Sequence, residues 1–126
     1  ASNDATARVW SSKTGEEIFV LRGHTSMLTI ARYSPNGKFI VTASVDKTAR
    51  VWDAKTGQKL HKLSSHTKSV NSVDVSTDNR FILTASEDLT ARIWDARSGE
   101  EVALLNDHEA SVRFAVFSPD AKKIVT

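Results

Sequence analysis

The chain has 126 residues, 40% of them hydrophobic and 25% charged, a composition that argues against a disordered chain. It contains no Cys, which excludes a disulfide framework and a Cys-based zinc site. Lys and Arg number 17 against 15 Asp and Glu, and the small excess of +2 forms no basic cluster, so we predict no nucleic-acid partner. No apolar run or leader of the signal type is visible, so we expect no membrane partner and a cytoplasmic or recombinant soluble protein.

The first segment reads as two strands joined by a tight turn. Alternation of apolar and polar residues around Ala7 and Val9 predicts a strand that ends near Trp10. Ser11 to Gly15 then predicts a hairpin connection with its Gly at positive φ. Glu16 to Leu21 follows as an outer strand.

The next segment adds an inner pair of strands. After His24, the run Leu28 to Ser34 predicts an innermost strand, and Phe39 to Ser44 predicts a second strand beside it. Pro35-Asn36-Gly37 between them is a strong turn signal. A strand through Trp52 closes the unit.

This unit recurs three times at a spacing of 42 residues. His24 aligns with His66 and His108, and Trp52 aligns with Trp10 and Trp94. The same shift predicts outer strands at Gln58 to Leu63 and Glu100 to Leu105, inner strands at Val70 to Ser76 and Val112 to Ser118, and a second strand at Phe81 to Ser86. The third copy has Ala121 at the position of Gly37, and a positive φ there would cost about 1 kcal/mol.

A period near 40–45 residues with Gly-His and Trp-Asp dipeptides resembles the WD40 family. The dipeptides stand at Gly23-His24 and Trp52-Asp53, while Ser65-His66, Asp107-His108 and Trp10-Ser11 depart from the family pattern. The resemblance implies an all-β fold, a β-propeller of four-stranded antiparallel blades with three blades per chain.

The third copy stops inside its second strand, at Thr126. When Ala1-Ser2 is placed after Thr126, the run that starts at Ile124 matches Ile40 to Ser44 residue for residue. We therefore expect residues 1–126 to form one propeller segment with two complete blades and one split blade. Copies placed head to tail, separate or covalently continuous, would close a ring, with nine blades favoured over six. The period without insertions is typical of a designed or consensus-like sequence.

The family resemblance also implies one hydrogen-bonded side-chain set per blade. Carried over by position, the sets are His24, Ser44, Asp46 and Trp52; His66, Ser86, Asp88 and Trp94; and His108 with Ser2, Asp4 and Trp10 of the following copy. Thr42, Thr84 and Thr126 stand two residues before each Ser, so either hydroxyl fits.

Ser, His and Asp together raise the hypothesis of a hydrolase. We favour a structural role, because the set recurs in every repeat and no Gly-flanked Ser motif is present. Three His spaced 42 apart lack zinc-ligand spacing, so we predict no metal and no cofactor. His61, in an outer strand, reads as a solvated side chain.

A partner would be expected on the rim between blades, as in proteins of this family. The candidate positions differ in size and charge between copies: Asn3, Arg22, Ser26, Val45, Ser64, Lys68, Glu87, Asn106 and Ala110. Aromatic residues Tyr33, Phe114 and Phe117 read instead as inner-strand core. We predict a non-enzymatic, symmetric self-assembling scaffold; the alternative is a natural protein- or peptide-binding module taken from a larger repeat protein.

Overall fold

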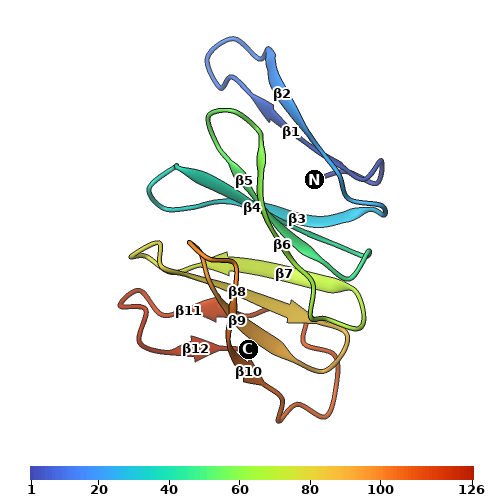
Figure 1. Ribbon diagram of the computed structural model, residues 1–126, viewed down its shortest axis with the longest axis vertical. Coiled ribbons are helices and arrows are strands. Elements are labelled where there is room, and N and C mark those ends of the chain that lie inside the picture. The colour runs from blue at the N-terminus through green and yellow to red at the C-terminus, as the bar shows by residue number, and fades with distance from the viewer.

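The computed structural model describes all 126 residues and consists of strands, with no helix long and apolar enough to cross a membrane. Four antiparallel sheets follow one another in chain order, from β1 and β2 at one end of the molecule to β11 and β12 at the other (Figure 1). The all-β prediction is confirmed.

Two of the sheets have four strands each, and strands that follow one another in the chain are neighbours in the sheet. The first has the order β3-β4-β5-β6 and the second β7-β8-β9-β10. Their bounds are β3 Leu28–Tyr33, β4 Phe39–Ser44, β5 Ala49–Asp53 and β6 Lys59–Leu63, then β7 Val70–Val75, β8 Phe81–Ser86, β9 Ala91–Asp95 and β10 Glu101–Leu105. The predicted second strands, β4 and β8, are confirmed at both ends.

The other two sheets have two strands each. At one end β1 (Thr6–Trp10) pairs with β2 (Glu17–Arg22), and at the other β11 (Val116–Phe117) pairs with β12 (Ile124–Val125). The inner strand expected over Val112 to Ser118 is therefore much shorter. In the complete blades the equivalent residues pair with the last residues of β4 and β8, whereas Thr126 is the one residue that follows β12 in this chain.

The inner turns contain the expected strain. In each copy the N–H of the third turn residue donates to a Ser carbonyl: Gly37 to Ser34, Asn79 to Ser76 and Ala121 to Ser118. Their φ angles are 69°, 63° and 56°. Ala121 thus adopts the left-handed conformation whose cost was considered from its alignment with Gly37, and which an L side chain reaches only at that cost.

The core lies between successive sheets. The largest cluster joins residues of β4, β5 and β6 to residues of β7, β8 and β9 and includes Trp94. A second cluster brings Trp52 against Ala7 and Leu21 of the first sheet. A third packs β8 and β9 against Val112 and Ala115. Each Trp of a complete blade therefore packs on the sheet before it.

Three side chains differ from their predicted environments. Tyr33 and Phe114 are exposed, and only Phe117 is partly buried, so the prediction of core packing was wrong for the first two. The equivalent positions of the second copy are buried, so burial at these positions differs between copies. His61 is partly buried, since its ring lies where a Cβ on Gly99 would be, 2.8 Å from Cγ.

Candidate functional site

The hydrogen-bonded set of the first complete blade is assembled from a loop and two strands. His24 precedes β3, Thr42 lies in β4, Asp46 lies in the turn after β4, and Trp52 lies in β5. His24 Nδ1 is 2.8 Å from Asp46 Oδ2, and His24 Nε2 is 2.8 Å from Thr42 Oγ1. The indole Nε1–H of Trp52 donates to the same Thr42 oxygen over 2.8 Å.

The proton positions follow from the charges. Burial would raise the pKa of Asp46, but hydrogen bonds from the Thr48 hydroxyl, the Thr25 N–H and His24 lower it to about 2, so its carboxylate only accepts. Burial lowers the pKa of His24 more than Asp46 raises it, so the ring is neutral at pH 7. His24 Nδ1–H therefore donates to Asp46, and Nε2 accepts from the hydroxyl of Thr42.

The second complete blade repeats this arrangement. His66 Nδ1 is 2.8 Å from Asp88, His66 Nε2 is 2.8 Å from Thr84, and Trp94 donates to Thr84 over 2.9 Å. Burial again lowers the pKa of His66, and the pKa of Asp88 is lowered because the hydrogen bonds from Thr90, Thr67 and His66 outweigh burial.

In each set the hydroxyl that bonds the His belongs to Thr, and the Ser makes different hydrogen bonds. Ser44 donates toward the carbonyls of Ser26 and Met27 and accepts from the N–H of Asp46. It thereby ties the turn after β4 to the loop before β3. Ser86 does the same in the next blade with Lys68 and Ser69.

A fifth member of each set was not anticipated. Thr48 donates to Asp46 Oδ1 over 2.6 Å, and Thr90 does the same to Asp88. Thr6 makes the equivalent bond to Asp4 in the first sheet. These Thr recur at the 42-residue spacing, two residues after each Asp, so the period could have predicted them as members of the sets.

The hydrogen bonds that join Thr42, His24 and Asp46 are those of a catalytic triad of hydroxyl, base and acid. The hydroxyl and the base are, however, closed off from solvent. Thr42 is 0% exposed, and the His24 side chain is 1% exposed. The Thr42 oxygen is also occupied by the Trp52 N–H. A nucleophile must reach its substrate, so this set has the geometry of an internal clamp between strands.

The residues predicted to form the third set lie towards the two ends of the chain. His108 Nε2 is 2.7 Å from Thr126 Oγ1, which follows β12. Ser2 and Asp4 precede β1, and Trp10 is its last residue. His108 Nδ1 is buried and has no hydrogen-bond partner. Trp10, unlike the other two Trp, is exposed.

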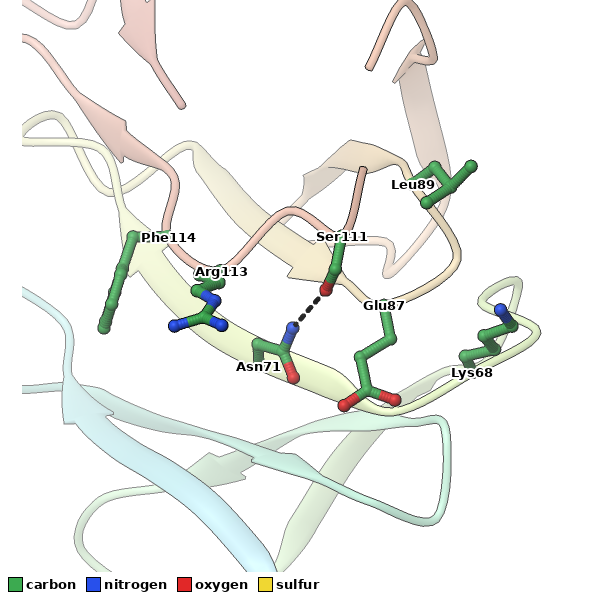
Figure 2. Close-up of a pocket in the computed structure, with 7 residues that line it drawn as sticks. All are labelled: Lys68, Asn71, Glu87, Leu89, Ser111, Arg113 and Phe114. Atoms are coloured by element: carbon green, nitrogen blue, oxygen red, sulfur yellow. Dashed lines mark hydrogen bonds between the residues drawn. The ribbon is translucent and has the colours of Figure 1, made fainter. Parts of the chain in front are cut away.

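The largest hollow lies at the loops beside β7. It has a volume of about 730 Å³ and is lined by the seven residues drawn in Figure 2: Lys68, Asn71, Glu87, Leu89, Ser111, Arg113 and Phe114. Asn71 donates to Ser111 and to the carbonyl of Val112 across it. It therefore combines charges of both signs with an exposed aromatic ring.

Of the nine rim positions, only Lys68 and Glu87 line this hollow, and Ala110 lines the adjoining one. Loop bonds bring Ser26 close to Val45, since Ser44 Oγ bonds the Ser26 carbonyl and the Val45 N–H donates to Met27. Asn3, Arg22, Ser64 and Asn106 are exposed and line no hollow. Nowhere do three or more His, Cys, Asp or Glu side chains gather as metal ligands would.

The sequence model of the family described as "WD domain, G-beta repeat" matches residues 15–53 and 57–95, more than half of the chain. The chain belongs to the WD40 family. The two matched stretches carry the outer strand of one blade and the first three strands of the next. No curated protein matches the sequence. WD40 repeats generally form non-catalytic scaffolds for protein interaction.

Proposed function

We propose that this WD40 chain is a non-enzymatic scaffold that assembles with copies of itself into a closed, symmetric propeller of nine blades. In this proposal residues 1–126 are one propeller segment. The first and last sheets are the two halves of a single blade, with β11 and β12 of one copy beside β1 and β2 of the next. The 42-residue period, free of insertions, suits a sequence designed for such symmetry.

The first support comes from two apolar side chains, Trp10 and Val125, which are exposed although their equivalents in the other repeats are buried. Trp10 is 54% exposed, whereas Trp52 and Trp94 are 2% and 3% exposed. Val125 is 65% exposed, whereas Val41 and Leu83 at the same repeat position are 0% exposed. Apolar surface of this size favours contact with another sheet.

A groove at the last sheet has the right lining for Trp10. It has a volume of about 210 Å³, and Ile93, Phe117 and Ile124 are among the residues that line it. Trp52 packs on Ala7 and Leu21 of the sheet before it. The positions in β9 and β10 equivalent to those two are Ala91 and Leu105, so Trp10 of a second copy would meet the same kind of surface.

The polar support is His108. Its Nδ1 is buried without a partner, although the equivalent atoms of His24 and His66 bond Asp46 and Asp88. A buried unpaired N–H costs about 1–3 kcal/mol. Asp4 occupies the same repeat position as Asp46 and Asp88, so Asp4 of a second copy could accept a hydrogen bond from His108 Nδ1. The Asp4 carboxylate already accepts from Thr6 as Asp46 does from Thr48.

The test substitutes Val125→Lys and measures assembly by sedimentation. The matched control is Leu60→Lys, because Leu60 and its equivalents Ile18 and Val102 are exposed in every repeat. Val125→Lys should abolish the assembly and Leu60→Lys should leave it intact. Assembly that survives Val125→Lys would refute the proposed joint.

A second candidate function, peptide binding on the rim, is favoured by the hollow that contains Lys68, Glu87 and Arg113. Peptides selected from a random display library should lose affinity with Arg113→Ala and keep it with Arg97→Ala, since Arg97 lies in the outer hairpin. Equal effects of the two changes would contradict rim binding.

A further inference from the structure

One buried cation in the first complete blade has no partner. Arg50, in β5, is only 9% exposed, and its Nε has no hydrogen-bond partner. Arg92 Nε is unpaired as well, but Arg92 forms an ion pair with Glu101 and the Arg50 side chain forms none. A guanidinium carries five N–H donors and cannot lose its charge, so a buried one normally has a carboxylate or a carbonyl beside it.

The other two repeats supply that carboxylate. Arg8 bonds Glu17, and Arg92 bonds Glu101 over 2.7 Å. Glu17 is paired with Trp10 across the sheet, and Glu101 with Trp94. The residue paired with Trp52 is Lys59. At this one corner of the molecule, the acid is replaced by a base.

The neighbours of Arg50 add positive charge. Lys62 is its direct partner across β5 and β6, and it acts together with Arg50 to disfavour the charged form of His24. The loop residue at this corner is Gly23, where a Cβ would lie 2.5 Å from Arg50 Nη1. In the next repeat that loop position is Ser65, and the Ser65 side chain acts together with Arg92 to lower the pKa of Glu101.

We propose that the corner formed by Gly23, Arg50, Lys59 and Lys62 binds a carboxylate from an acidic segment of a partner protein. The ligand would occupy the place that Glu17 and Glu101 have in the other repeats. Arg50 Nη groups would donate to it in a charge-assisted bond, and Lys59 and Lys62 would supply attraction over a longer range. This site lies in a blade that one chain completes, so it does not depend on assembly.

The experiment uses the full 126-residue chain and tetraglutamate as the probe, at constant ionic strength. Binding is followed by the NMR signal of the Arg50 Nε–H, with that of Arg92 as an internal reference. The key variant is Lys59→Glu, which restores the internal acid at an exposed position. The matched control is Lys55→Glu, an exposed change of the same charge in the adjoining hairpin.

We expect a saturable shift of the Arg50 signal, at least roughly tenfold weaker binding for Lys59→Glu, and unchanged binding for Lys55→Glu. No saturable shift, or an equal loss in both variants, would overturn the site. Tighter binding of inorganic phosphate than of tetraglutamate would overturn the assignment to a carboxylate.

Discussion

Replacing Thr42 by Val tests whether the buried clamp stabilises the blade. The two side chains are nearly equal in volume, so the change removes the hydroxyl and little else. It leaves two buried groups without a partner, the Trp52 Nε1–H and the His24 Nε2. Each unpaired group costs about 1–3 kcal/mol, and the added methyl group recovers part of this, so we expect a loss of about 2–4 kcal/mol in the free energy of unfolding.

The assay is urea unfolding followed by Trp fluorescence at one protein concentration, because the proposed assembly would make stability depend on concentration. The control is Thr25→Val, an exposed Thr whose side chain makes no hydrogen bond and whose N–H binds Asp46. It should change the stability by less than about 0.5 kcal/mol. A loss below this value for Thr42→Val as well would refute the clamp.

The remaining predictions concern pH and the strained turn. Because the pKa of His24 and His66 is lower in the folded state than in the unfolded chain, folding stability should be full above pH 6.5 and decline as the pH falls below it. The Asp46 carboxylate, with a pKa of about 2, adds a further loss below about pH 4, and urea midpoints from pH 8 to 3 would measure both. A midpoint that rises on acidification would contradict this. Ala121→Gly should stabilise the protein by about 1 kcal/mol and Gly37→Ala should destabilise it by a similar amount, as thermal melts would report; a lower melting temperature for Ala121→Gly would argue against turn strain.

The sequence predicted the strands well because the 42-residue period aligns three independent copies of each. The bounds of β4 and β8 came from that alignment, which also marked Ala121 as the position where a positive φ would be costly. Thr42 and Ser44 could not be separated in the same way. They are two residues apart on one strand, so their side chains point to the same face, and both hydroxyls recur at the period.

Packing between repeats was the part that the sequence could not supply. His61 was expected in solvent and instead lies against Gly99 of the next blade, a contact that depends on how two sheets are placed. Tyr33 and Phe114 have the pattern of core residues, but their burial depends on a neighbouring sheet. Burial is a property of the assembly of sheets, whereas periodicity reports only which face a residue is on.

The measurement that tests the self-assembly most directly is the native mass of the 126-residue chain beside its mass under denaturing conditions. Closure into nine blades predicts a denatured mass of 13.8 kDa and a native mass three times larger. A native mass twice the denatured one would mean a six-blade ring and contradict the nine-blade proposal. A native mass equal to 13.8 kDa would contradict self-assembly itself.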